Sequence, residues 1–369
     1  MPMKIAILGT RGVPNHYGGF EQFAEFFSVY LAQKGHEVYV YNSHDHPYQE
    51  KIFNGVNIIH CNDPEHKLGT FGQFIYDYNC IMDSRTRDFD IILQLGYTSN
   101  SVWFFLLPKK SYIVTNMDGL EWKRSKYSRP VRQFLKFAER LAAMSSDCLV
   151  SDSLGIKKFL KQRYGKESTY IAYGAHPFND PDPAIPEQYG VQQYDYNMIM
   201  ARFEPENNLD MVLAGVAASE SKKTILVIGK HTTKYGRYLT GKYAAYKHIR
   251  FIGPLYNLEH LNSLRYYSNL YFHGHSVGGT NPSLLEAMGS QALIAAHDND
   301  FNKGILMDNA FYFSNSGDVK KLLASVKKSD NLPKVAVNYA AIVNDFNWEK
   351  INGEYLALLE RCHRENQAK

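Results

Sequence analysis

Two series of short apolar segments, separated by one polar stretch, constrain the fold of this chain most strongly. In the first series, runs such as KIAILG at residues 4–9 and DIILQLG at residues 90–96 alternate with segments of helical periodicity. A second series begins with YNMIMAR at residues 196–202 and ends with AFYFSN at residues 310–315. Strands that alternate with helices form parallel sheets covered by helices, so each series predicts one α/β unit.

The polar stretch between the two series, FNDPDPAIPEQYGVQQYD, is rich in proline and is predicted to be a linker. We therefore expect a Rossmann-like domain at residues 1–178, a linker at 179–194, a second Rossmann-like domain at 195–345 and a closing helix at 346–369. A chain of 369 residues is long enough for two cores. Two such domains imply a cleft between them, and ligands bind at the carboxyl ends of the strands.

The charge of the chain is small overall but uneven. The net charge is +4, which is too weak to argue for nucleic-acid binding. Residues 109–140 hold nine basic side chains against three acidic ones, and residues 129–144 have the periodicity of a helix with a basic face. Such a face could meet anionic lipid or a diphosphate-bearing acceptor. A solvated helix face is an equally good interpretation.

The cysteines and the apolar runs indicate a cytoplasmic protein. The four cysteines have no metal-like spacing and no secretory context, so we expect reduced thiols. The first residues, MPMKIAILGT, predict a strand and lack the features of a signal peptide. No apolar run is long enough for a membrane span. The expected location is therefore the cytoplasm, with peripheral contact at the inner face of the membrane through segment 109–140.

The stretch HGHSVGGTNPSLLEAMG, at residues 273–289, carries the strongest functional pattern. Asn281 is a favourable N-cap residue, and Pro282 then occupies the first helical position, where its missing N–H has no consequence. The preceding residues Gly278, Gly279 and Thr280 can bring backbone N–H groups close to a ligand. A helix N-terminus behind a glycine-rich loop is a typical phosphate site.

Glu286 lies about one turn inside this helix. A carboxylate in that position can accept hydrogen bonds from ribose hydroxyls, as acids do in dinucleotide folds. It could instead only complement the helix dipole.

Polar side chains follow two strands of the second series. Arg202 comes directly after YNMIMA, where its guanidinium could bind a phosphate with two hydrogen bonds. Asn207 stands at the start of the next helical segment, and Lys230 follows the strand KTILVIG. A lone cation after a strand is usually a surface residue. These residues are candidates for ligand binding only because residues 273–289 are expected at the same edge of the sheet.

The first strand is followed by GTRGVPNHYGGFEQFAE, which does not match a dinucleotide fingerprint. After Gly9 neither glycine spacing of that motif is completed, and the second strand ends without an acid for a ribose, so NAD binding is disfavoured. Gly18 and Gly19 open the next helix and allow close approach of a ligand that is anionic or rich in hydroxyls. They could also be two flexible loop glycines.

Asp118 follows the strand SYIVTNM and precedes Gly119. Its carboxylate could orient or deprotonate an acceptor hydroxyl, although Asp-Gly is more often only a turn. The segment Asp298-Asn299-Asp300 could hold a divalent metal, but without another ligand nearby it predicts a turn. No Ser-His-Asp or Cys-His pattern of a nucleophile with its base is evident. We expect no bound metal and no cofactor.

Taken together, these segments resemble the GT-B glycosyltransferases of family 4. The resemblance rests on the Gly18-Gly19 loop, DGLEW at residues 118–122, SDSLGIKKFLKQRYG at 151–165, Arg202 and PSLLEAMG with Glu286, which follow the family's order. More narrowly, GTRGVPNHYGGFE, ARFEPENN and GHSVGGTNPSLLEAMG resemble the bacterial rhamnosyltransferase branch, whose members build cell-surface polysaccharides. The resemblance implies two Rossmann-like domains that face a cleft, with the closing helix crossing back to the first domain.

The resemblance also implies an activity: a retaining, metal-independent transfer of a sugar, L-rhamnose from dTDP-L-rhamnose, onto a glycan or a polyprenyl-diphosphate-linked acceptor. Glu286 would hold the ribose, and Arg202 would bind the diphosphate and assist catalysis. The first domain would carry the acceptor beside Asp118 and touch the donor phosphates through Gly18 and Gly19. The remaining donor contacts would come from Asn207, Lys230, Gly278, Gly279, Thr280 and Asn281.

Three positions depart from the family pattern. Gly278 replaces the first glutamate of Glu-x7-Glu, Asn207 replaces a lysine, and Asp118 replaces a histidine. Lys230 could restore the charge that the missing lysine would supply. We interpret the departures as an adaptation to a deoxysugar donor, which has fewer hydroxyls to bind.

Other functions stay open from the sequence alone. A nucleotide-sugar epimerase on the same fold would need no lipid-linked acceptor. A non-catalytic scaffold that binds nucleotide sugar would tolerate the changes at Gly278 and Asn207. An NAD oxidoreductase is disfavoured by the missing fingerprint.

Overall fold

The computed structural model describes residues 2–124 and 126–368, which form two compact units. The first unit consists of residues up to Trp122, then Ser128–Tyr173 and Trp348–Lys369. The second consists of Lys123–Tyr127 and Gly174–Asn347. Each unit is described separately below.

The first unit is built on a sheet in the order β3-β4-β2-β1-β5-β6-β7-β8, which is parallel except for the short β3–β4 pair. The middle strands are apolar along their length because helices cover both faces. β5, with the sequence IILQL, is buried at every position. The strands are β1 Lys4–Leu8, β2 Glu37–Ser43, β3 Ile52–Phe53, β4 Val56–Cys61, β5 Ile91–Leu95, β6 Tyr112–Asn116, β7 Cys148–Ser151 and β8 Thr169–Tyr170.

Helices connect these strands as the sequence predicts. The helix that Gly18 and Gly19 were expected to open is α1, and the amphipathic segment expected at 129–144 is α4. The helical elements of the first unit are α1 Gly19–Gln33, α2 Glu65–Leu68, α3 Thr70–Ser84, η1 Ser101–Leu106, η2 Glu121–Lys123, α4 Arg129–Ser145, α5 Leu154–Tyr164 and α14 Trp348–Gln367, where η marks a short 3-10 helix.

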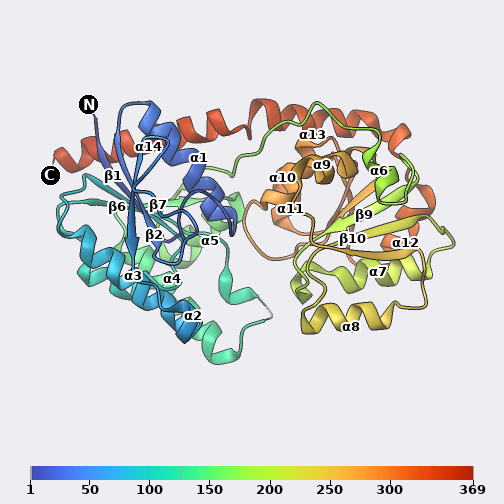
Figure 1. The fold of residues 1–369 in the computed structure, drawn as a ribbon, viewed down its shortest axis with the longest axis horizontal. Helices are drawn as coiled ribbons and strands as arrows, with labels where there is room; N and C mark the ends of the chain where they lie inside the picture. Colours follow the sequence, from blue (N-terminus) through green and yellow to red (C-terminus); the bar gives the residue numbers. More distant parts are fainter. Residues whose placement is uncertain (1, 125, 369) are drawn as a thin grey trace. The chain divides into compact units, whose positions relative to one another are not determined.

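The closing helix α14 runs along α1 within the first unit (Figure 1). Tyr355 of α14 packs on Phe23 of α1 at a ring distance of 4.6 Å, and Trp348 packs on Phe26 at 4.7 Å. The buried amide of Asn116 donates a hydrogen bond to the Tyr355 hydroxyl at 2.8 Å. The last helix of the chain is therefore part of the core of the first unit.

The second unit has a parallel sheet in the order β11-β10-β9-β12-β13-β14. α9, α10, α11 and α13 cover one face, and α7, α8 and α12 cover the other (Figure 1). The strands are β9 Tyr196–Met200, β10 Thr224–Ile228, β11 Ile249–Gly253, β12 Leu270–His273, β13 Ile294–His297 and β14 Phe311–Phe313. The helical elements are α6 Ile185–Gln188, η3 Pro205–Asn207, α7 Leu209–Ala218, α8 Lys234–Lys242, α9 Leu258–Tyr267, α10 Pro282–Gly289, α11 Asp300–Leu306, α12 Ser316–Ser325, η4 Lys328–Asn331 and α13 Leu332–Asn344.

The segment predicted as a linker at residues 179–194 packs on the second unit instead. It contains α6, which lies against α9. The Asp182 N–H donates to the Ser263 hydroxyl at 3.1 Å, and the Tyr267 hydroxyl donates to the Pro181 carbonyl at 3.2 Å. The prolines and polar residues of this segment thus belong to the packed second unit, whose longer part begins at Gly174. Composition alone does not distinguish a packed segment of this kind from a free linker.

Both sheets reverse their winding beside their first strand. In the first unit the chain proceeds outward from β1 and returns as β5 on the other side of β1. In the second unit it returns as β12 beside β9. Ligands of doubly wound sheets bind at such reversal points, beyond the carboxyl ends of the strands. The loops after β1 and β5, and those after β9 and β12, are therefore the places to search for a site.

Two further expectations can be compared with the structure. The four cysteines form no disulfide. No helix in the described ranges combines the length and the apolar character needed to span a bilayer.

Removing one hydroxyl tests the attachment of α14. Tyr355→Phe leaves the buried Asn116 amide without its acceptor, so it should lower the free energy of unfolding by about 1–3 kcal/mol in urea titrations. Tyr78→Phe, at a ring that is 37% exposed, should change the free energy by less than about 0.5 kcal/mol. Equal effects of the two substitutions would contradict this role of α14.

Candidate functional site

The predicted donor residues of the second unit follow three adjacent strands. Lys230 comes just after β10, Arg202 just after β9, and residues 274–281 directly after β12. Parallel strands place their carboxyl ends at one edge of the sheet, so these groups share that edge. Arg202 and Lys230 are both exposed. The edge therefore carries two available cations at the reversal point of the sheet.

A set of hydrogen bonds fixes the loop after β9 to the loop after β12. The Glu206 carbonyl accepts from the Ser276 N–H at 3.0 Å and from the Ser276 hydroxyl at 2.8 Å. The Asn208 amide donates to the Gly274 carbonyl at 2.8 Å. A side chain at Gly274 would meet the Asn207 carbonyl oxygen at 2.2 Å, so only glycine fits there. The two loops behave as one preorganised element.

The side chain of Asn207 contacts its own loop, whereas its position in the sequence indicated a contact with the ligand. Its side chain is buried, and its amide donates to the Arg202 carbonyl at 2.8 Å. A buried amide used in this way shapes the loop that carries Arg202 and is not directed at a ligand. We therefore interpret Asn207 as a positioning residue, and the predicted direct contact with the donor is revised accordingly.

The helix start after the glycine loop forms as predicted. The Asn281 side chain accepts a hydrogen bond from the Ser283 N–H at 3.0 Å, and Pro282 is the first residue of α10. Thr280 is buried, whereas Gly279 is half-buried. Gly278 has a φ of 140°, a conformation that other residues rarely adopt. A glutamate at this position would strain the backbone, so the departure from Glu-x7-Glu has a local structural cause.

Glu286 is held by a buried arginine that the sequence analysis did not identify. Arg265, on α9, is fully buried and donates to a Glu286 carboxylate oxygen at 2.8 Å. Its other terminal nitrogen donates to Asn262 at 2.9 Å. The Glu286 side chain keeps 28% exposure, so one part of the carboxylate reaches solvent. This pair fixes Glu286 as an acceptor and argues against a role limited to the helix dipole.

Two histidines at the end of β12 were also missed. His273 and His275 stack with ring centres 4.4 Å apart. Burial, together with the nearby guanidinium groups of Arg202 and Arg124, lowers the pKa of His275 to about 3. Burial likewise holds the pKa of His273 well below its ordinary value. Both rings are therefore neutral at physiological pH, and they add no positive charge beside Arg202.

In the first unit, the loop between β1 and α1 is braced from several sides. The Asn42 side chain accepts from the Val13 N–H at 3.0 Å and donates to its carbonyl at 2.8 Å. Arg11 forms a two-point ion pair with Glu65, the shorter contact being 2.8 Å. No local sequence pattern indicates these partners, because they come from distant segments.

The entrance to α1, at Gly18 and Gly19, lies beside an acid. Glu21 is buried, and its carboxylate accepts from the Arg11 N–H at 3.0 Å. The second Glu21 oxygen would lie 3.2 Å from a Cβ at Gly18. A carboxylate at this helix N-terminus opposes binding of a second anion. The geometry therefore favours a hydroxyl-bearing group at Gly18 and Gly19 over the donor phosphate that the sequence analysis assigned to them.

Asp118 follows β6, two strands away from β1 at the same edge of the first sheet. Its backbone has a φ of 49°, and its N–H donates to the Asn116 side chain at 2.9 Å. The next carbonyl, of Gly119, accepts from the buried Tyr97 hydroxyl at 3.1 Å. The Asp118 backbone is thus in the left-handed region, the chain bends at Gly119, and the Asp118 side chain is partly exposed.

Within residues 2–124 and 126–368, two groups could be considered for metal binding, and neither fits. His44, Asp45 and His66 place ligand atoms within 4.8 Å of one another. However, His44 Nδ1 accepts from the Asp63 N–H at 2.9 Å, so Nε2 carries the proton and donates toward Asp45. In the second unit, Asn299 is the N-cap of α11, accepting from Phe301 and Asn302. The Asp298-Asn299-Asp300 segment is therefore a helix cap, which refines the predicted turn.

The Arg265–Glu286 pair predicts unequal costs for its two members. Glu286→Leu leaves a fully buried guanidinium without its counter-charge and should cost about 3–5 kcal/mol of unfolding free energy. Arg265→Met leaves a carboxylate that water can reach, so it should cost about 1–3 kcal/mol. Urea unfolding followed by circular dichroism measures both values. A larger cost for Arg265→Met would show that the guanidinium does not depend on Glu286.

The lowered pKa of His275 predicts a dependence of stability on pH. The unfolded side chain binds a proton near pH 6.5, whereas the folded one does so only near pH 3. Stability from this residue is therefore complete above pH 6.5 and is lost as the pH falls, by about 2 kcal/mol at pH 5. His275→Gln should remove that part of the pH slope in urea titrations between pH 7.5 and pH 5. A pH slope of His275→Gln equal to that of the unaltered chain would contradict this effect of burial.

The chain is similar to one described family and to several solved structures. Residues 3–176 match a family described as a domain of unknown function, DUF1972. No curated protein sequence matches the chain. Sucrose-phosphate synthase from Thermosynechococcus elongatus has a similar structure, with 14% identity, a TM-score of 0.80, and coverage of 97% of this chain and 98% of that one.

Two further solved structures are similar over nearly their whole length. HepE from Anabaena, in complex with UDP and glucose, has 14% identity and a TM-score of 0.73, covering 97% of this chain and 100% of that one. WaaG, a glycosyltransferase involved in lipopolysaccharide biosynthesis, has 12% identity and a TM-score of 0.67, covering 95% and 98%. Likeness at such low identity establishes the fold. The chain has the α/β GT-B fold that its sequence predicts, with two Rossmann-like units on parallel sheets.

Proposed function

We propose that this chain is a glycosyltransferase that uses a nucleoside diphosphate sugar as its donor. The observation that carries the proposal is the edge of the second sheet. There Arg202, the glycine loop 274–281 and the Glu286 carboxylate held by Arg265 lie around one reversal point. The complex of the similar HepE structure with UDP and glucose supports this choice of ligand.

In this proposal the second unit binds the nucleoside diphosphate without a metal. Glu286 accepts hydrogen bonds from the ribose hydroxyls. The diphosphate contacts the N–H groups of Gly278, Gly279, Thr280 and Asn281, together with Arg202 and Lys230. Because His273 and His275 are neutral, the two exposed cations and the helix N-terminus supply the positive potential. Preorganised donors of this kind stabilise a leaving diphosphate as negative charge develops on it.

The first unit holds the acceptor in this proposal. Gly18 and Gly19 approach a hydroxyl-bearing part of a ligand, because Glu21 lies at the same helix entrance. Asp118 orients the attacking acceptor hydroxyl, from a backbone held by hydrogen bonds to Asn116 and from Tyr97. The leaving diphosphate oxygen takes the acceptor proton on the same face as the attack, so the anomeric configuration is retained.

We further propose that the sugar is L-rhamnose, transferred from dTDP-L-rhamnose to a glycan or a lipid-linked acceptor of a cell-surface polysaccharide. The support is the resemblance of GTRGVPNHYGGFE, ARFEPENN and GHSVGGTNPSLLEAMG to the rhamnosyltransferase branch of family 4. Gly278 adds to it, because a glycine leaves no side chain to bind sugar hydroxyls. In the same proposal the enzyme acts in the cytoplasm, where segment 109–140 contacts the inner face of the membrane.

Calorimetric titration with the diphosphates of thymidine, uridine and guanosine and with NAD, with and without EDTA, tests the donor site. We expect one diphosphate to bind irrespective of EDTA. Arg202→Ala removes charge-assisted hydrogen bonds worth about 1.5–3 kcal/mol, so it should weaken binding by about 10–100-fold. Glu286→Ala removes the acceptor of the sugar hydroxyls and should also weaken binding of that diphosphate, while Arg364→Ala, at an exposed arginine of α14, should change nothing.

Other outcomes of the titration decide against the proposal. Binding of NAD in place of any diphosphate would indicate an oxidoreductase. Absence of all binding would leave only a scaffold. Turnover of dTDP-L-rhamnose without an acceptor, to a second sugar nucleotide with release of no diphosphate, would indicate an epimerase.

A further inference from the structure

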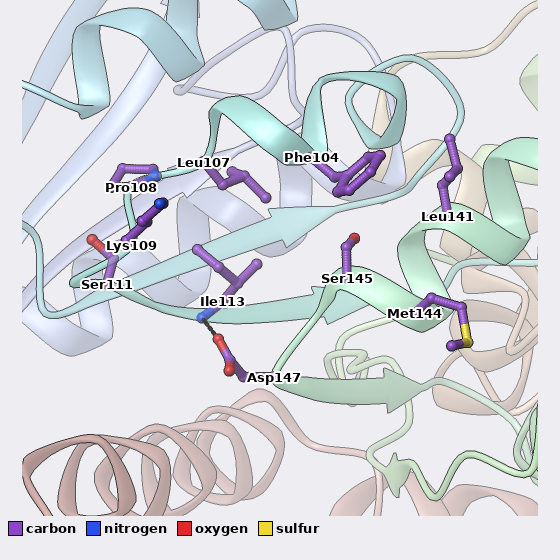
Figure 2. A pocket seen from close by; sticks show the side chains of 10 residues that line it. All are labelled: Phe104, Leu107, Pro108, Lys109, Ser111, Ile113, Leu141, Met144, Ser145 and Asp147. Atoms are coloured by element: carbon purple, nitrogen blue, oxygen red, sulfur yellow. Dashed lines mark hydrogen bonds between the residues drawn. The ribbon is translucent and has the colours of Figure 1, made fainter. Parts of the chain in front are cut away.

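A pocket of about 310 Å³ lies in the first unit, away from the loops discussed above (Figure 2). It is bounded by η1 and the residues after it, the start of β6 and the last turns of α4. Ser111 precedes β6 and Asp147 precedes β7, so the pocket is at the amino ends of these strands. Asp118, which follows β6, is at the opposite edge of the sheet. The pocket is therefore separate from the proposed acceptor site.

The interior of the pocket is mainly hydrocarbon. Two of its polar groups are already used by the fold: the Asp147 carboxylate accepts from the Ile113 N–H at 2.9 Å, and the Ser111 hydroxyl donates to the Phe89 carbonyl at 2.6 Å. The volume is at the lower end of the range typical of small-molecule sites. The apolar lining consists of Phe104, Leu107, Pro108, Ile113, Leu141 and Met144.

Large apolar side chains are exposed around this pocket. Phe104 and Phe105 of η1 are 41% and 63% exposed, and Phe137 and Met144 of α4 are 54% and 58% exposed. Phe137, Leu141 and Met144 have the spacing i, i+4 and i+7, which places them on one face of α4. α4 lies against η1, so these side chains form a continuous apolar surface. Soluble proteins rarely expose such surfaces without a partner.

Cations accompany this apolar surface. Lys109 lines the pocket, and Arg140 is exposed on α4 between Phe137 and Met144. Lys110 is also exposed, and its contact with Asp88 is long, at 3.9 Å. Apolar side chains bordered by lysine and arginine match the boundary between acyl chains and anionic headgroups in a bilayer. This charge complementarity argues for an anionic lipid over a neutral apolar ligand.

We propose that this pocket takes the hydrocarbon chain of an anionic membrane lipid, with the lipid phosphate beside Lys109. Phe105, Phe137 and Met144 then enter the interface around that chain. The inference deepens the proposed membrane contact of segment 109–140, on which it rests, and it does not depend on the transfer of a sugar. It gives that contact a defined site in place of a diffuse basic face.

Soluble alkyl phosphates test the pocket directly. The full chain is titrated by calorimetry with inorganic phosphate and with butyl, octyl and decyl phosphate below their micelle concentrations. Each buried methylene should tighten binding about fourfold, so decyl phosphate should bind about fifteenfold more tightly than octyl phosphate. Inorganic phosphate and butyl phosphate should not bind. An affinity that does not grow with chain length would overturn the proposal.

Filling the pocket provides the matched comparison. Ser145→Phe places a ring in the cavity and should abolish the dependence on chain length, whereas Gln133→Phe adds the same ring to an exposed position of α4 and should not. Equal binding by both variants would overturn the proposal. Thermal unfolding of Ser145→Phe, together with its nucleoside diphosphate titration, establishes that this variant is folded. If the unaltered chain bound decyl phosphate but no diphosphate, the lipid site would stand and the proposed donor site would fall.

Vesicles distinguish a bilayer lipid from a free amphiphile. The full chain should sediment with vesicles of phosphatidylglycerol and phosphatidylcholine, and not with phosphatidylcholine alone. Ser145→Phe and Lys109→Glu should each weaken this binding at least tenfold, while Gln133→Phe should bind like the unaltered chain. Sedimentation of Ser145→Phe equal to that of the unaltered chain would overturn the inference. Binding of decyl phosphate without any binding to vesicles would overturn the role in membrane docking.

Discussion

Parallel pairing of strands places every strand end of a sheet at one of two edges, and the proposed function of this chain depends on that constraint. In the second unit it gathers the loops after β10, β9 and β12, although they are separated by up to about 70 residues of sequence. Hydrogen bonds from Asn208 and Ser276 then join two of these loops into one element. A charged ligand at that edge meets groups that are already in place, which lowers the cost of ordering them on binding.

The charged groups at this edge have separate roles. Arg202 and Lys230 are exposed and available, whereas Arg265 is buried and its charge is used to hold Glu286. The two histidines beside them are neutral because they are buried. The entrance to α1 in the first unit carries the carboxylate of Glu21. The second unit is thus suited to an anion and that entrance to hydroxyls, which fits a donor half and an acceptor half of a transferase.

Much of the fold could be predicted from local sequence, because the pattern of apolar runs and helical periodicity is local. The strands predicted at KIAILG and DIILQLG are β1 and β5, and the cap at Asn281 forms as expected. What failed depended on tertiary contacts. The stretch around α6 has the composition of a linker but packs on α9. Asn207 occupies a position that the sequence pattern assigns to ligand binding, but its side chain donates to the Arg202 carbonyl in the same loop.

Arg265, His273 and His275 could not be recognised as site residues because their partners come from other elements. One signal was present for Arg265: it shares the helical spacing of Leu261 and Leu264, so it stands among apolar positions of its helix. A charged residue there indicates a buried partner, although not which one. Asp118 and the GT-B architecture followed from spacing and resemblance, and the structure confirms the architecture.

A crystal structure of the chain soaked with dTDP shows whether the edge of the second sheet holds a nucleoside diphosphate. We expect the 3′-hydroxyl of the deoxyribose within hydrogen-bond distance of Glu286, with the diphosphate against loop 274–281 and the Arg202 guanidinium. A diphosphate bound at the Gly18–Gly19 entrance of the first unit, with Glu286 contacting only Arg265, would contradict it.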